Sequence, residues 1–216
     1  SVLNQQPSGG DWPCHLTLDG SGRWLFVANY GTGSMSVLPV LGDGSLGPRS
    51  AHVQHQGSGP NAERQEGPHA HSTTLTPEGG AAIVADLGID SLVFYSLDSD
   101  TGHLTGREPV STRPGSGPRH LAFHPTGTRL YVAHELDSTV SVFSVADGHY
   151  TEIQTESTVP PGVGENSVAD IHLSPDGTRL YVSNRGHNSL AIFAVDDDGA
   201  LKPLGHASCG GNWPRN

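Results

Sequence analysis

The chain repeats one pattern four times, and this repeat limits the folds open to it more than any other feature. The clearest copy is residues 117–145, GPRHLAFHPTGTRLYVAHELDSTVSVFSV. Apolar, β-branched and aromatic residues fill three short runs, and turn residues such as Pro125-Thr126-Gly127 separate them. The pattern therefore predicts three strands, at 120–123, 130–134 and 140–145.

The other copies begin at His15, His71 and Asp170. Each has a turn glycine after its first strand, and these glycines are 57, 48 and 50 residues apart: Gly22, Gly79, Gly127 and Gly177. Each copy also ends in a polar hairpin with a weaker fourth strand. The second strands (WLFVA, AAIVA, RLYVA and RLYVS) are almost continuously apolar, as expected where both faces are packed. A four-stranded repeat of about 40–50 residues is typical of a β-propeller blade, so we predict an all-β propeller of four-stranded antiparallel blades.

We expect one domain over residues 1–216, a β-propeller fragment with blades at about 12–56, 69–114, 118–160 and 168–208. The motif Gly9-Gly10-Asp11-Trp12-Pro13 returns 201 residues later as GGNWP. We therefore expect partial blades at both ends, around about four complete blades of a wider ring. Residues 53–68 form a polar, Gly-rich insertion, which predicts a loop leading into the inner strand of the second blade.

The charge and cysteine content limit which classes of partner and which cellular compartment the sequence favours. The chain has 22 acidic and 11 basic residues, a net charge of −11, which disfavours nucleic acid and anionic membranes as partners. No apolar run approaches the length of a membrane span. The two cysteines, Cys14 and Cys209, form no metal-binding or CxxC motif. These features favour a reducing compartment, and we predict a cytoplasmic protein.

Several long motifs carry a resemblance to a known family: GPRHLAFHP, YVAHELDSTVSVF, ADIHLSPDGTRLYVSNR, GGNWPRN and NAERQEGPHAHSTTLTPEGGAAIVADLGID. Together they resemble the lactonase family of seven-bladed β-propellers, which includes propeller-type 6-phosphogluconolactonase and the carboxy-muconate lactonising enzyme. The resemblance covers the whole chain. It implies a seven-bladed ring, with about three further blades beyond the four complete ones seen here.

The resemblance also implies a catalytic cluster of one histidine, two arginines and one glutamate. The matching residues are His71 in HAHS, Arg119 in GPRH, Glu135 in AHEL and Arg185 in SNRG. The repeat places His71 and Arg119 at the entry to a first strand, and Glu135 and Arg185 just after a second strand. Equivalent positions of a propeller lie near one rim of its channel, so we expect these four side chains to converge.

Hydrolysis of a lactone needs an activated water and stabilisation of the developing oxyanion. Glu135 or His71 is the candidate general base, and the sequence leaves the choice open. Arg119 and Arg185 are candidates to hold the oxyanion or a substrate phosphate through fixed, charged donors. We expect a small anionic lactone as substrate, with no cofactor and no metal.

Each candidate also has a structural alternative. Arg119 could tie adjacent blades through backbone carbonyls, Glu135 could be a solvated turn residue, and Arg185 could be an exposed hairpin arginine. His71 could be an ordinary histidine among 13. The His69-x-His71 pair suggests a metal site, but the spacing indicates no third ligand.

Three functions remain at this point. The first is a lactone hydrolase of carbohydrate metabolism, a 6-phosphogluconolactonase of the pentose phosphate pathway. The second is a lactonising cycloisomerase of the carboxy-muconate type. The third is a non-catalytic propeller that binds a protein or a small ligand.

Overall fold

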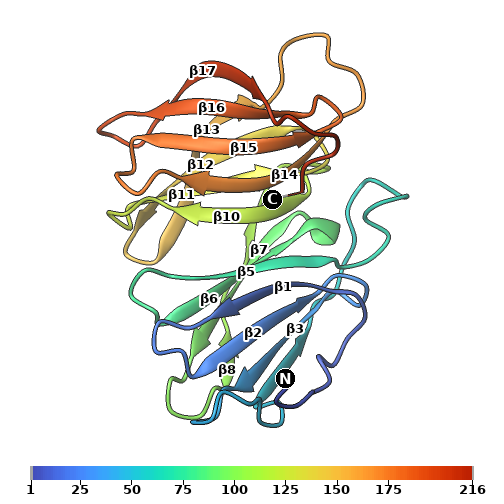
Figure 1. Cartoon of the computed structure of the whole chain (residues 1–216), viewed down its shortest axis with the longest axis vertical. Coiled ribbons are helices and arrows are strands. Elements are labelled where there is room, and N and C mark those ends of the chain that lie inside the picture. The colour runs from blue at the N-terminus through green and yellow to red at the C-terminus, as the bar shows by residue number, and fades with distance from the viewer. Residues whose placement is uncertain (1, 216) are drawn as a thin grey trace. The chain divides into compact units, whose positions relative to one another are not determined.

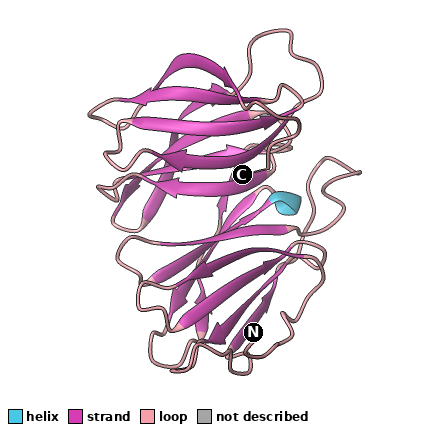
Figure 2. Ribbon diagram, in the orientation of Figure 1, coloured by secondary structure: helices cyan, strands magenta, loops and turns pink. Residues whose placement is uncertain are grey.

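The computed structural model describes residues 2–215, and strands dominate it (Figure 2). The described part contains 17 strands and one short 3-10 helix, which confirms the predicted all-β fold. No helix within residues 2–215 is long and apolar enough to cross a membrane. Two compact units divide the chain, one ending at Pro114 and the other beginning at Gly115. Each unit holds two of the four repeat copies, and the single-domain organisation stays a prediction.

The first copy forms an antiparallel sheet with the strand order β1-β2-β3-β4 (blue in Figure 1). Its strands are β1 (Pro13–Leu18), β2 (Trp24–Asn29), β3 (Ser34–Pro39) and β4 (Ala51–Gln54). No strand follows β4 until residue 70, which confirms most of the predicted insertion loop.

The second copy has the order β5-β6-β7-β8, and its outermost strand is broken into two pieces. The short β8 and β9 both pair with β7, separated by Arg107, Glu108 and Pro109. The elements are β5 (Ala70–Leu75), β6 (Ala81–Asp86), the helix η1 (Leu87–Ile89), β7 (Ser91–Leu97), β8 (Leu104–Gly106) and β9 (Val110–Ser111).

The second unit contains two regular four-stranded antiparallel sheets. One is made of β10 (Pro118–Phe123), β11 (Arg129–His134), β12 (Thr139–Ala146) and β13 (His149–Ser157). The other, orange to red in Figure 1, is made of β14 (Ser167–Leu173), β15 (Arg179–Arg185), β16 (Ser189–Val195) and β17 (Leu201–Ser208). The three strands predicted within residues 117–145 are confirmed as β10, β11 and β12.

Each unit has a core between its two sheets, to which the nearly continuous apolar second strands contribute. In the second unit Tyr131 and Val142 pack with Leu180 and Phe193, all almost fully buried. The Tyr131 hydroxyl crosses between the sheets and donates to the carbonyl of Gly199 at 2.9 Å. In the first unit Phe26, Met35, Val84 and Tyr95 belong to the corresponding core. Burial of these side chains is the main favourable contribution to the packing of sheet on sheet.

The hairpin between each second and third strand ends in a left-handed residue. Gly33, Asp90, Ser138 and Asn188 directly precede the third strands of their sheets, with φ of 61°, 49°, 57° and 56°. Only at Gly33 does a neighbouring backbone also exclude a side chain. A Cβ there would lie 2.3 Å from the carbonyl oxygen of Pro68, close to the start of β5.

Replacement of Gly33 by alanine is therefore expected to destabilise the first unit strongly. The left-handed conformation alone costs about 1–2 kcal/mol, and displacement of Pro68 adds about 1–3 kcal/mol. Gly22→Ala is the matched control, because Gly22 has a φ of 70° but open space around its Cβ position. Chemical denaturation of both variants checks the difference, and equal losses of unfolding free energy would contradict the role assigned to the Pro68 contact.

Candidate functional site

A register shift marks the start of every first strand. The pairing of β1, β5, β10 and β14 with their second strands slips between Pro13 and His15, Ala70 and Ser72, Pro118 and His120, and Val168 and Ile171. The residues inside these shifts are Cys14, His71, Arg119 and the pair Ala169-Asp170. A β-bulge re-aims a side chain out of the normal alternation. Two of the four predicted catalytic residues, His71 and Arg119, therefore occupy the same backbone feature in successive copies.

Three of the predicted residues meet in the second unit around one carboxylate oxygen. Glu135 directly follows β11, and its Oε2 lies 2.9 Å from Nε of Arg119 and 2.6 Å from Nη2 of Arg185. The three side chains are 5%, 3% and 7% exposed, respectively. Close, charge-assisted contacts of this kind are among the strong hydrogen bonds of proteins.

Backbone carbonyls hold the two guanidinium groups further. Nη1 of Arg119 donates to the carbonyl of Ala169 in the neighbouring sheet, and Nη2 of Arg185 donates to the carbonyl of Val168 at 2.8 Å. The alternatives of a solvated Glu135 and an exposed Arg185 are therefore wrong. The alternative that Arg119 ties adjacent sheets through a carbonyl is correct, and it coexists with the ion pair.

The charge balance of this group favours an anion. Burial lowers the pKa of Arg119 to about 10, against the opposing attraction of Glu135, so its guanidinium remains protonated at neutral pH. The carboxylates of Glu135 and Asp170 and the guanidiniums of Arg185 and Arg215 all act on Arg119. Three guanidiniums therefore stand against two carboxylates, which leaves an excess positive charge in a chain whose net charge is −11. Such a buried, partly compensated site attracts a negatively charged group.

A histidine–aspartate pair lies beside Arg119 and was not predicted. Nδ1 of His120 is 2.5 Å from Oδ1 of Asp170, and Nε2 of His172 is 2.8 Å from Oδ2. Burial alone would raise the pKa of Asp170, but hydrogen bonds from His120 and from the Ile171 amide outweigh it and hold this pKa well below its usual range. The sequence signal was that His120 and Asp170 stand at matching places in successive copies.

His71, the fourth predicted residue, lies in the first unit. Its side chain is buried, and its ring meets Tyr30 edge-on with 5.5 Å between ring centroids. Tyr30 also stacks on His69, with centroids 4.4 Å apart and an interplanar angle of 12°. Tyr30 directly follows β2, which is the position that Glu135 occupies after β11, and sequence reasoning overlooked this equivalence.

The alternative of a metal at His69 and His71 finds no support in the geometry. Nδ1 of His69 lies 3.0 Å from the carbonyl oxygen of Tyr30, and Nε2 lies 3.3 Å from Oε1 of Glu66. Among residues 2–215 no three histidine, cysteine, aspartate or glutamate side chains are grouped to hold a metal ion.

Comparison with known proteins identifies the family of the chain. The family model described as "Lactonase, 7-bladed beta-propeller" matches residues 1–216. The chain belongs to this lactonase family. The predicted propeller fold and the predicted family are thereby confirmed, and the four sheets of the chain are blades of a family whose members have seven.

Relatives of the chain include two bacterial proteins that carry the same name. A Bacillus subtilis protein named 6-phosphogluconolactonase is 41% identical over 100% of the chain and 62% of its own length. One of the same name from Formosa agariphila is 34% identical over 100% of the chain and 63% of its own length. The solved structure of a periplasmic gluconolactonase of Pseudomonas aeruginosa matches with a TM-score of 0.91 and 36% identity, covering 98% of the chain and 61% of that protein. The chain thus spans about three fifths of the length of these relatives.

Removal of the charge of Glu135 is expected to destabilise the second unit. In Glu135→Gln two buried guanidiniums lose their shared countercharge, which we expect to cost about 3–5 kcal/mol of unfolding free energy. Glu165→Gln is the control, because Glu165 is an exposed carboxyl of the same unit. Urea denaturation measures both variants, and equal stability of the two would show that the buried ion pairs contribute little.

The partly buried Asp170, with its lowered pKa, is expected to make the protein less stable in acid. Its folded pKa lies below the unfolded value of about 3.9, so its contribution is present above that value and is lost as the pH falls through the folded pKa. Denaturation series between about pH 5 and pH 2 should therefore give a shallower pH dependence for Asp170→Asn than for the natural sequence. Asp197→Asn, at an exposed site, should keep the natural slope. An unchanged slope in Asp170→Asn would contradict the assignment.

Proposed function

We propose that the protein containing this chain hydrolyses a lactone of carbohydrate metabolism, with 6-phosphogluconolactone as its substrate. The observation that carries the proposal is the buried carboxylate of Glu135 between the guanidiniums of Arg119 and Arg185. An anionic ester substrate suits a site whose guanidiniums outnumber its carboxylates. The names of the relatives from Bacillus subtilis and Formosa agariphila support the same reaction.

In this proposal His71 is the general base. Oε2 of Glu135 already forms ion pairs with two guanidiniums, and a carboxylate stabilised in this way is a weaker proton acceptor. An imidazole is basic near neutral pH and suits the removal of a proton from water. His71 shares the bulged position of Arg119, which supports its assignment to the same site through the repeat.

The arginines stabilise negative charge in the reaction. Water attacks the lactone carbonyl, the carbonyl oxygen becomes an oxyanion, and the ring C–O bond then breaks. The carbonyl carbon keeps the new hydroxyl as a carboxylic acid, and the departing ring oxygen takes up a proton. Arg119 and Arg185 hold either the oxyanion or the substrate phosphate, and Glu135 holds both guanidiniums in place. The reaction needs no external oxidant or reductant.

The cytoplasm is the compartment we propose for this protein. Within residues 2–215, Cys14 and Cys209 form no disulfide, which suits a reducing environment. The net charge of −11 likewise supports a small-molecule substrate rather than nucleic acid or an anionic membrane. Fractionation of the source cells tests the proposed location. Recovery of the protein from the periplasm, the compartment given in the name of the Pseudomonas aeruginosa relative, would overturn it.

The decisive experiment is hydrolysis of 6-phosphogluconolactone by the complete gene product that contains this chain. Arg119→Ala and Glu135→Gln are each expected to lower kcat/KM by about a hundredfold or more, because charge stabilisation of the transition state is lost. Controls are Arg179→Ala and Glu165→Gln, two exposed positions in the same unit that should retain activity.

His71→Asn tests the base separately. It should lower kcat and remove the fall of activity on the acid side of the pH profile. If carboxy-muconate is turned over instead of the sugar lactone, the cycloisomerase alternative holds. If neither substrate reacts, or if all the variants match the natural protein, the proposed site is wrong.

A further inference from the structure

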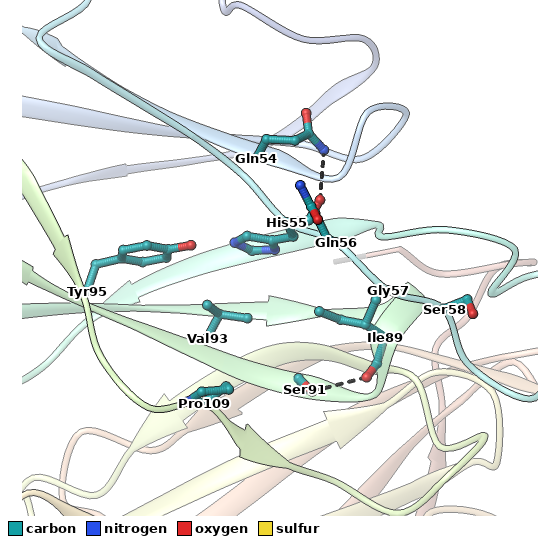
Figure 3. A pocket seen from close by; sticks show the side chains of 10 residues that line it. All are labelled: Gln54, His55, Gln56, Gly57, Ser58, Ile89, Ser91, Val93, Tyr95 and Pro109. Carbon is teal, nitrogen blue, oxygen red and sulfur yellow. Dashed lines mark hydrogen bonds between the residues drawn. The ribbon is translucent and has the colours of Figure 1, made fainter.

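The first unit contains a pocket of about 370 Å³ that includes none of the four catalytic candidates. One wall is the chain leaving β4, from Gln54 to Ser58, and the other is β7 with Ile89 and Pro109 (Figure 3). The pocket lies where the outermost strand of the second sheet is interrupted between β8 and β9. Its volume falls within the usual range of small-molecule sites.

A buried histidine–aspartate pair contributes to this pocket. Nδ1 of His55 lies 2.6 Å from Oδ2 of Asp86, and the two side chains are 2% and 0% exposed. Oδ1 of Asp86 accepts the amide hydrogens of His69 at 2.7 Å and Gly88 at 3.0 Å. Both carboxylate oxygens are therefore engaged, which suits an ionised Asp86 and a proton on Nδ1 of His55.

Two polar atoms at this pocket have no hydrogen-bond partner within residues 2–215. One is Nε2 of His55, which is buried, and the other is the hydroxyl of Tyr95. The His55 and Tyr95 rings are nearly parallel, with centroids 6.0 Å apart, and the Tyr95 hydroxyl points toward the His55 ring (Figure 3). Buried polar groups are normally satisfied, so the unpaired Nε2 of His55 indicates a missing partner, and the Tyr95 hydroxyl lies where the same partner can reach it.

The other residues that line the pocket determine which kinds of ligand fit it. Ile89, Val93 and Pro109 give the pocket apolar walls. Burial, with the charge of Asp86, raises the pKa of Tyr95 to about 12, so its hydroxyl stays neutral and can donate. Because His55 carries its proton on Nδ1, its Nε2 accepts a hydrogen bond. The buried negative charge of Asp86 disfavours an anion at this depth.

We propose that this pocket is a second ligand site, which takes a small neutral molecule made of one apolar ring with a hydroxyl group. The ring packs against Ile89, Val93 and Pro109. The hydroxyl donates to Nε2 of His55 and accepts from Tyr95. The site is independent of the proposed lactonase reaction, since it uses none of that reaction's residues.

Phenol is the probe, and toluene and benzoate are its comparators. Binding to the complete gene product is measured by calorimetry and by ¹⁵N NMR of the histidine rings. We expect saturable phenol binding that shifts the Nε2 resonance of His55, with weaker binding of toluene, which lacks the hydroxyl, and of benzoate, which is anionic.

Two variants locate the ligand while leaving the His55–Asp86 pair intact. Tyr95→Phe removes one hydrogen bond and should weaken phenol binding by about tenfold, and Val93→Phe should abolish it by filling the pocket. Tyr181→Phe, a partly buried tyrosine of β15, is the control and should leave binding unchanged. Absence of saturable phenol binding to the natural protein, as for a pocket holding water only, would overturn the proposal. Equal binding by all three variants would do the same.

Discussion

The register shift at the start of each first strand is the constraint on which the candidate site depends. Side chains along a regular strand alternate between two faces, and an extra residue breaks this alternation at one place. At Arg119 the displaced side chain can reach both Glu135, beyond the end of β11, and a carbonyl of the neighbouring sheet. A repeated backbone irregularity thus gives each copy a position outside the regular alternation, and the residues found there differ from copy to copy.

Burial increases the energetic effect of the charges at this site. Removal of two guanidiniums and a carboxylate from water is costly, and the attraction among them offsets this cost only while all three are in contact. Oε2 of Glu135 contacts both guanidiniums at once, and the carbonyls of Ala169 and Val168 accept further hydrogen bonds from them. The result is a rigid pair of cations whose orientation is set before any ligand arrives, which is the condition for effective electrostatic stabilisation.

Most of the strand pattern could be predicted, because apolar alternation and turn residues are local signals. The bulges could not be predicted, because a register shift appears only when two strands are paired. The contacts of Tyr30 with His69 and of His55 with Asp86 join residues far apart in sequence, within a unit whose loop over residues 55–69 has no periodic pattern. The candidate residues themselves came from the family resemblance, and three of them are found in contact.

The hydrogen bond from Arg119 to the carbonyl of Ala169 gives one side chain two duties, since the same guanidinium also binds Glu135. Any substitution there alters cohesion between neighbouring blades as well as the electrostatics of the site. Divergence of substrate preference by changes at residue 119 is therefore restricted by the need to keep the blades joined. Residues in the loops around the site do not join blades in this way, so substitutions there can change specificity at a smaller cost in stability.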